Sequence, residues 1–244
     1  MDYIYHFYLL LFIVAFLYAS VGHGGASGYL ALMALFSFNA EVMKPTALLL
    51  NLFVSGISFY QFYRGKHFLW KIFLPLAVAS VPMAFLGGSI HNIDPLLYKK
   101  ILGVLLLVPV IRFLFFPNIT VTEFKPSNLY LSLLIGGTIG FLSGLIGFGG
   151  GILLSPILLL LKWTDQKQTA AISALFIFVN SLSGLAGQLI KGVSFSTQMY
   201  SFVGVAVIAG CLGAYYGALK FNQSVLKNIL GCVLLLAAIK LLFT

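Results

Sequence analysis

Two hydrophobic regions of this chain are too long to be single membrane-spanning helices, and each has a cluster of glycines near its middle. The regions cover residues 4–37 and 128–162, and the clusters read VGHGG at 21–25 and IGFGG at 146–150. A straight helix of roughly 34 residues would extend about 50 Å, well beyond a hydrocarbon core of about 30 Å. Glycine in a helix interior costs about 1 kcal/mol relative to alanine. We therefore expect each region to form two helical pieces joined at the glycines.

The composition is that of an integral membrane protein. The chain of 244 residues is 61% hydrophobic and only 8% charged, whereas a soluble domain carries roughly 25% charged residues. Apart from the two long regions, hydrophobic segments of about one membrane span occupy residues 45–63, 70–90, 96–116, 168–190, 197–219 and 225–243. We predict an all-α polytopic membrane protein that crosses the cell (plasma) membrane several times.

The charged residues and the cysteines narrow the possible partners. The net charge is +9, but the lysines and arginines gather at segment ends, where they set topology and face lipid headgroups, so nucleic acid is not an expected partner. Cys211 and Cys232 lie apart in apolar segments with no Cys/His cluster near them. They are read as buried free thiols, and neither a metal nor a cofactor is expected.

The two halves of the sequence resemble each other along most of their length. The glycine clusters align with an offset of 125, and "YKKILGVLLLVPVIRFLF" near the end of the first half matches "LKNILGCVLLLAAIKLLF" near the end of the second. We predict a first transmembrane repeat at 1–116, a linker at 117–127 and a second repeat at 128–244. Each repeat has about four hydrophobic segments, the first of them broken at the glycine motif, and the two form one integrated membrane domain.

The paired breaks are the candidate binding site. Corresponding glycine-interrupted segments in two halves are typical of transporter sites, and free peptide groups at membrane depth are tolerated only where they are buried in protein or line a cavity. Each cluster is followed by a helix start, whose unpaired N–H groups attract anions. We expect the breaks to bind a small anion near the midplane through these groups and nearby side chains, namely Gly22, His23, Gly24, Gly25, Ser27, Asn51, Gly147, Gly149, Gly150, Gly151 and Asn180.

Plainer interpretations of the same residues stay open. The glycines are also of the kind that lets membrane helices pack closely, and the serines and asparagines of the kind that bonds between helices. His23 is either a proton site for coupled transport or a neutral side chain bonded to a carbonyl. The five acids fall at a terminus or in predicted loops, so a cationic substrate would lack a counter-charge within the membrane.

The motifs resemble those of the sulfite exporter TauE/SafE family of membrane permeases. The resemblance rests on "GHGGASGYLALMALF", on "GLIGFGGGILLSPILLLL", on the Lys-x-Thr-Ala pattern at 44–47 and 167–170, and on the duplication of four segments. It covers essentially the whole chain, and the first motif departs from the family pattern at His23 and Ala26. The resemblance implies a permease for small oxyanions, chiefly sulfite or organosulfonates.

The leading hypothesis is therefore a transporter that alternates access around the paired breaks. The alternative is a passive anion channel of the same architecture, which the scarcity of coupling groups favours. An enzyme is not favoured, because the sequence shows no carboxylate pair and no nucleophile beside a base.

The sequence leaves the membrane topology open between two arrangements. If each broken region crosses once, the lysines and arginines divide seven to seven between the two sides of the membrane. If each forms a hairpin, the repeats are inverted, both termini lie outside and the division is nine to five. The second arrangement fits the positive-inside rule better. Its nine are Arg64, Lys66, Lys71, Arg112, Lys125, Lys162, Lys167, Lys220 and Lys227.

Overall fold

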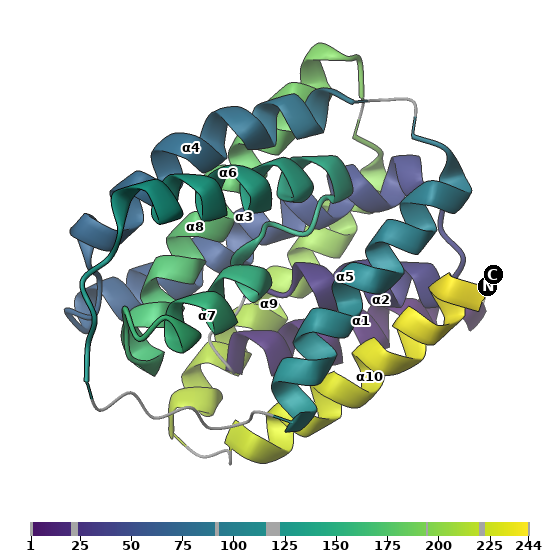
Figure 1. Cartoon of the computed structure of the whole chain (residues 1–244). Coiled ribbons are helices and arrows are strands. Elements are labelled where there is room, and N and C mark those ends of the chain that lie inside the picture. The colour runs from purple at the N-terminus through teal and green to yellow at the C-terminus, as the bar shows by residue number, and fades with distance from the viewer. Residues whose placement is uncertain are drawn as a thin grey trace.

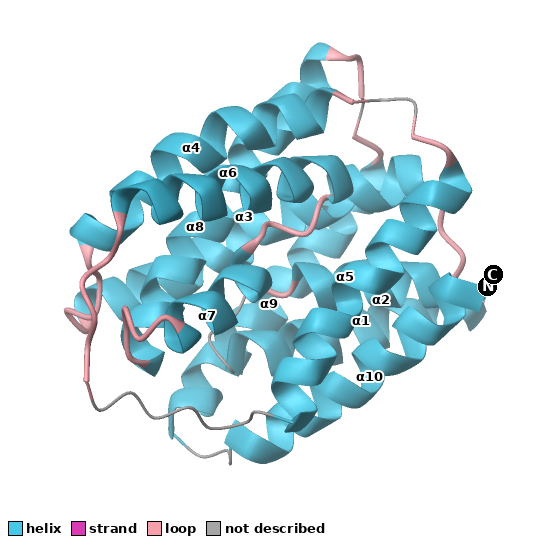
Figure 2. Cartoon of the chain, in the orientation of Figure 1, coloured by secondary structure: helices cyan, strands magenta, loops and turns pink. Residues whose placement is uncertain are grey.

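The computed structural model of the chain describes residues 2–20, 24–90, 93–115, 123–193, 195–219 and 223–243. Within these residues the structure is helical and contains no strand (Figures 1 and 2). The helices are α1 (Asp2–Ser20), α2 (Ala26–Leu35), α3 (Ala40–Arg64), α4 (Trp70–Ser89), α5 (Pro95–Phe115), α6 (Leu129–Ile146), α7 (Gly151–Leu160), α8 (Gln166–Ile190), α9 (Thr197–Leu219) and α10 (Gln223–Phe243).

The structure breaks both long hydrophobic regions at their glycine clusters. The first region is divided into α1 and α2, and the second into α6 and α7. Gly25 and Gly150 are the N-cap residues of α2 and α7, and both have positive φ, 88° and 78°. Because glycine adopts this conformation without the Cβ clash of other residues, each cluster supplies the turn that separates its two helices. The expected pair of helical pieces is confirmed in both regions.

Each broken region is a hairpin that returns to the end of the molecule at which it began. Phe7 of α1 packs against Phe36 and Phe38, which follow α2, with ring centroids 5.2 and 5.0 Å apart. Before α6, the N–H of Lys125 donates to the carbonyl of Lys162, which follows α7, at 2.9 Å. In Figure 1, α1 begins and α10 ends at one end of the molecule, here called the terminal end, and α6 begins at the opposite end. The hairpins therefore enter from opposite ends.

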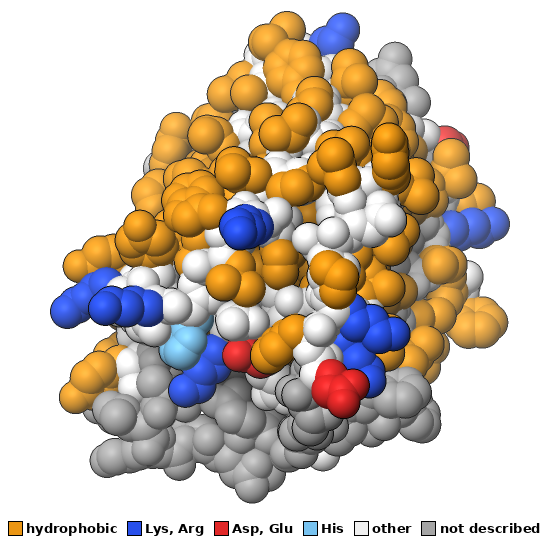
Figure 3. Space-filling model, turned by 60° about the vertical axis from the view of Figure 1, so that its left-hand side comes forward, with side chains coloured by type: hydrophobic (Ala, Val, Ile, Leu, Met, Phe, Trp, Pro, Cys, Tyr) orange, Lys and Arg blue, Asp and Glu red, His pale blue; other side chains and the backbone are white. Residues whose placement is uncertain are grey.

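The outer surface of the protein is suited to lipid. Four helices, α3, α4, α6 and α8, are long and apolar enough to cross a membrane, judged on the described residues. Hydrophobic side chains predominate in the upper part of the face shown in Figure 3. Exposed examples include Val78 on α4 and Leu134 on α6. A contiguous apolar surface of this kind would aggregate in water, so it indicates a bilayer around the helices.

Glycines bring α6 into backbone contact with α4. Gly136, Gly140 and Gly144 are spaced four residues apart and so share one face of α6. A Cβ on Gly140 would collide with the carbonyl oxygen of Ser80 on α4, and a Cβ on Gly144 with that of Ala84. Small residues permit this close approach in membrane proteins. The contact fixes the position of α6 and hence of the break that follows it.

The first hairpin is held in a comparable way by α9. A Cβ on Gly213 of α9 would collide with the carbonyl oxygen of Phe16 on α1, and the hydroxyl of Ser20 donates to the Gly213 carbonyl at 2.9 Å. The last turn of α1 is therefore anchored just before the first break.

Helix α3 starts earlier than the hydrophobic pattern predicts. The pattern places the segment at 45–63, whereas the helix runs from Ala40 with Pro45 inside it. Pro45 is the sixth residue of the helix, so it removes the hydrogen bond that position 45 would otherwise donate to the carbonyl of Glu41.

Candidate functional site

The two glycine clusters pack against the same side chain, that of Ile177 on α8. A Cβ on Gly24 would be 3.1 Å from Cγ2 of Ile177, and a Cβ on Gly149 would be 2.8 Å from the same atom. Gly151 is packed against Ile177 even more closely. Ile177 is 4% exposed. The breaks that enter from opposite ends therefore come together inside the protein, with Ile177 between them.

The backbone of the second break is in the left-handed region at three glycines. Gly147, Gly149 and Gly150 have φ of 93°, 77° and 78°. A residue with a Cβ pays roughly 1–2 kcal/mol in this region, so glycine is favoured. In the described part of the chain, neither Gly149 nor Gly150 donates its N–H to another residue. These amides, with the first N–H groups of α7, are available as donors.

The helices that start at the breaks lack side-chain caps. Neither Gly25 nor Gly150 provides a capping hydrogen bond to α2 or α7. Helices α3 and α4 also lack one, whereas Asn128 caps α6 and Asp165 caps α8 in a complete capping box. Two uncapped, buried helix N-termini carry the positive ends of the helix dipoles into the interior.

An unpartnered hydroxyl lies beside each of these N-caps. The hydroxyl oxygen of Tyr29 would be 2.6 Å from a Cβ on Gly25, and Cβ of Ser143 would be 3.5 Å from one on Gly150. The Tyr29 and Ser143 hydroxyls are buried without a hydrogen-bond partner. Burial of an unsatisfied hydroxyl is costly, so both groups are candidates to bind a polar ligand at the breaks.

Asn51 on α3 and Asn180 on α8 are completely buried. Nδ2 of Asn51 donates to Oγ of Ser181 at 3.3 Å and would be 2.6 Å from a Cβ on Gly149. Nδ2 of Asn180 donates to the carbonyl of Phe176 at 2.8 Å. Both Oδ1 atoms lack a partner. A carboxamide has two N–H donors, so Asn51 retains one donor beside Gly149. The structure thus brings Asn51 to the second break, although Asn51 belongs to the first half.

The remaining predicted residues of the first break divide into two groups. Ser27 is in the first turn of α2, and its hydroxyl is 2.7 Å from that of Tyr18 on α1. This contact ties the two arms of the first hairpin together. Gly22 and His23 lie outside the described residues, so the proton role suggested for His23 stays a prediction.

A lysine borders the second break. The backbone of Lys44 lies against Gly147, where a Cβ would be 2.9 Å from the Lys44 carbonyl oxygen. The ammonium of Lys44 donates to the carbonyls of Ile90 at 3.1 Å and Gly88 at 3.5 Å, near the end of α4. The residue is 8% exposed. The carbonyl end of α4 therefore stabilises this ammonium group without neutralising it, so Lys44 adds positive potential near the break.

Acidic groups do not offset this potential. Glu41, Asp94 and Glu123 are exposed, and Asp165 is engaged in the cap of α8. Among the described residues, no group of three or more His, Cys, Asp or Glu side chains could hold a metal ion. Glu41 lies in the first turn of α3 rather than in the predicted loop, but still at a helix end. The arrangement can bind an anion through amides and hydroxyls.

Ile177 and Tyr29 were not among the predicted site residues. Both are apolar or aromatic residues in apolar helices, where such residues normally belong to the core or face lipid. Ile177 has no feature that marks it, whereas the hydroxyl of Tyr29 in a hydrophobic helix is a weak signal, because a buried tyrosine O–H usually finds a partner.

Comparison with known proteins gives a consistent result. The family model described as "Sulfite exporter TauE/SafE" matches residues 7–241. A probable membrane transporter protein of Sinorhizobium fredii is 35% identical over 239 residues, which cover 96% of each chain. A probable membrane transporter protein of Bacillus subtilis is 25% identical and covers 91% of each chain. One from Methanocaldococcus jannaschii is 31% identical over 59% of this chain and 54% of its own length. No solved structure gives a significant match.

Proposed function

The chain belongs to the sulfite exporter TauE/SafE family, and from this premise we propose that it is a permease for small oxyanions that binds its substrate between the two glycine breaks. Sulfite or an organosulfonate is the proposed substrate class. The family description supports sulfite, and the donor-rich, acid-free lining of the breaks supports an anion.

The observation that carries the proposal is the meeting of two uncapped helix N-termini on Ile177. Anions bind at such N-termini because several N–H groups converge there and the dipole is favourable. The hydroxyls of Tyr29 and Ser143 and one N–H of Asn51 are additional donors beside the same glycines. Together they supply hydrogen bonds to an oxyanion from both sides.

We further propose that the chain is built from two inverted repeats, at 1–116 and 128–244. The helix partners support this. α6 lies on α4 and α1 on α9, which are corresponding pairs when the first half is exchanged for the second. The pairs α3–α8 and α5–α10 map onto themselves under the same exchange. Rocking of one repeat against the other would then open the breaks to each side in turn.

The course of the two hairpins determines which lysines and arginines lie at each end of the molecule, and so supports an orientation of the protein in the membrane. With both broken regions returning to their starting ends, nine of the fourteen lysines and arginines belong by their place in the chain to the end opposite the termini. The positive-inside rule assigns that end to the cytoplasm. We therefore propose that both termini face outward.

Uptake of labelled sulfite into proteoliposomes tests the proposal. The wild-type protein is expected to give saturable flux. Ser143→Ala removes one donor at Gly150, and because a hydrogen bond to a charged group contributes about 1.5–3 kcal/mol, the half-saturating sulfite concentration should rise at least about tenfold. Thr138→Ala is the matched control, since Thr138 lies on the same helix, is exposed and bonds only to its own helix.

Two results would contradict the proposal. Equal half-saturation for Ser143→Ala and Thr138→Ala would place the site elsewhere. Flux that increases linearly without saturation, together with single-channel currents, would instead support the passive channel.

A further inference from the structure

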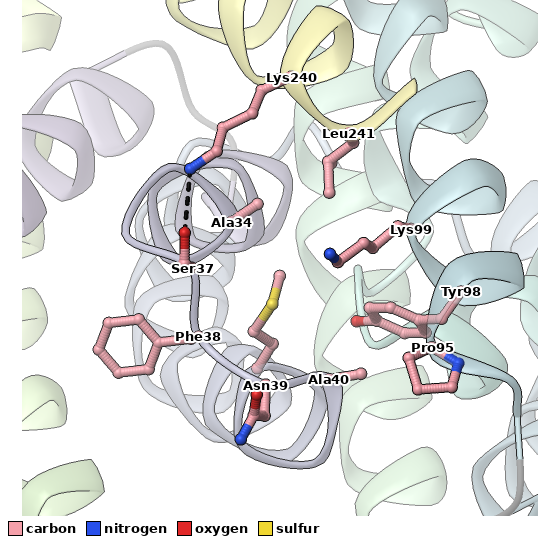
Figure 4. Close-up of a pocket in the computed structure, with 11 residues that line it drawn as sticks. Ala34, Ser37, Phe38, Asn39, Ala40, Pro95, Tyr98, Lys99, Lys240 and Leu241 are labelled. Atoms are coloured by element: carbon pink, nitrogen blue, oxygen red, sulfur yellow. Dashed lines mark hydrogen bonds between the residues drawn. The ribbon is translucent and has the colours of Figure 1, made fainter. Parts of the chain in front are cut away.

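A second polar site lies at the terminal end of the molecule, away from the glycines at the N-caps. It is a cavity of about 200 Å³ formed where α2 ends, α3 and α5 begin and α10 ends (Figure 4). Its polar lining consists of Ser37, Asn39, Tyr98, Lys99 and Lys240, and no acidic residue is among the described lining residues. The ammonium group of Lys99 gives this cavity a positive potential.

The two lysines play different parts in this cavity. The ammonium of Lys240 donates to the carbonyl of Leu35 at 2.7 Å and to Oγ of Ser37 at 3.1 Å, so it caps the C-terminal end of α2. Lys99 is exposed, and among the described residues it has no hydrogen-bond or ion-pair partner. Figure 4 shows its nitrogen among the lining side chains. The charge of Lys99 is therefore available to a ligand.

Tyr98 connects the cavity to the second break. Its ring contributes to the cavity lining, and its buried hydroxyl donates to the carbonyl of Ile146 at 2.8 Å. Ile146 is the last residue of α6 and directly precedes Gly147. Tyr98 is thus shared between the cavity lining and the end of the helix that enters the second break.

We propose that this cavity recruits the anion on the terminal side, with Lys99 as the residue that attracts it before it passes to the glycine breaks. The inference rests on the proposed function, since it assigns the first binding step of the same anion. A cavity lined by one sign of charge raises the local concentration of the oppositely charged ion, and salt weakens the effect. The ligand class is a small oxyanion of one or two negative charges.

Neutralising Lys99 tests the inference in proteoliposomes with labelled sulfite. Lys99→Gln should raise the half-saturating concentration about three- to fivefold at low ionic strength, with maximal flux unchanged, and the difference should fall to less than about twofold near 0.5 M salt. Lys99→Arg keeps the charge and should resemble the wild type. Lys100→Gln is the matched control, because Lys100 is the adjacent exposed lysine and does not line the cavity.

The outcomes separate this inference from the proposed function. Saturable wild-type flux with identical kinetics for Lys99→Gln and Lys100→Gln would overturn the recruitment role alone. If the wild type moves no sulfite, the proposed function fails for sulfite, and amine acetylation followed by mass spectrometry decides the inference. Protection of Lys99 but not Lys100 by methanesulfonate would then uphold the site, and equal labelling of both would overturn it.

Discussion

Replacing Gly149 by alanine should destabilise the protein through two separable effects. The first is conformational, because φ at Gly149 is 77° and an L-residue there costs about 1–2 kcal/mol. The second is steric, because the new Cβ would be 2.6 Å from Nδ2 of Asn51 and 2.8 Å from Cγ2 of Ile177. Overpacking of this kind costs typically about 1–3 kcal/mol. The total is about 2–5 kcal/mol.

Gly192→Ala isolates the conformational effect. Gly192 follows α8 with a φ of 85°, and nothing lies within 4 Å of the position its Cβ would take. Its replacement should cost only the about 1–2 kcal/mol of a left-handed alanine. The difference between the two variants, about 1–3 kcal/mol, then measures how tightly Asn51 and Ile177 enclose the break.

Thermal unfolding of the detergent-purified protein measures the loss of stability in both variants. For a chain of this size, each kcal/mol lowers Tm by about 2–4 °C, so Gly149→Ala should melt several degrees below Gly192→Ala. The double variant Gly149→Ala/Ile177→Ala should be less destabilised than the sum of the single variants, because the second change removes the atom in contact. Equal melting of Gly149→Ala and Gly192→Ala would refute the close approach of the breaks to α8.

Three further changes test the packing around the breaks. Gly140→Leu should abolish the peak of folded protein on size-exclusion chromatography, because the new Cβ would collide with the α4 backbone. Gly137→Leu on the same helix should elute normally, because no atom of another helix lies closer than 3.8 Å to its Cβ. Normal elution of both variants would contradict the tight helix contact. Tyr98→Phe removes the hydroxyl that donates to the buried carbonyl of Ile146. The variant should lower the free energy of unfolding by about 1–3 kcal/mol in thermal unfolding. An unchanged Tm would show that this hydrogen bond contributes nothing to stability. Asp165→Ala removes the cap of α8 and should cost about 1 kcal/mol by the same measurement, whereas no loss would mean that solvent replaces the cap.

The helix breaks could be predicted from the sequence because length and glycine content agree there. A region of roughly 34 apolar residues cannot lie straight across a bilayer, and glycine supplies the positive φ seen at Gly25 and Gly150. The hairpin course was favoured by the charge counts, nine to five against seven to seven, but not decided by them. The deciding contacts, such as Phe7 with Phe36, join apolar residues whose type says nothing about their partners.

The candidate site was predicted less completely than the breaks. Residue type and position predicted the glycines and Asn51 as ligands, and the structure places Gly24, Gly149 and Asn51 together at the breaks; their role in binding stays a prediction. Ile177 and Tyr29 were not predicted as site residues, because an apolar or aromatic side chain in a membrane helix is usually part of the core or faces lipid. The spacing of Gly136, Gly140 and Gly144 is visible in the sequence, but which helix approaches that face depends on the tertiary fold.

The contacts between the first and last parts of the chain have a consequence for biogenesis. α1 is synthesised before α9, yet α9 anchors the last turn of α1 through Gly213. α6, by contrast, meets α4 after α4 has already been made. During insertion the first hairpin must therefore remain in the bilayer without this neighbour until α9 has been synthesised, whereas the second hairpin can pack against α4 at once. Truncation before α9 should consequently leave the first hairpin accessible to proteases or membrane chaperones.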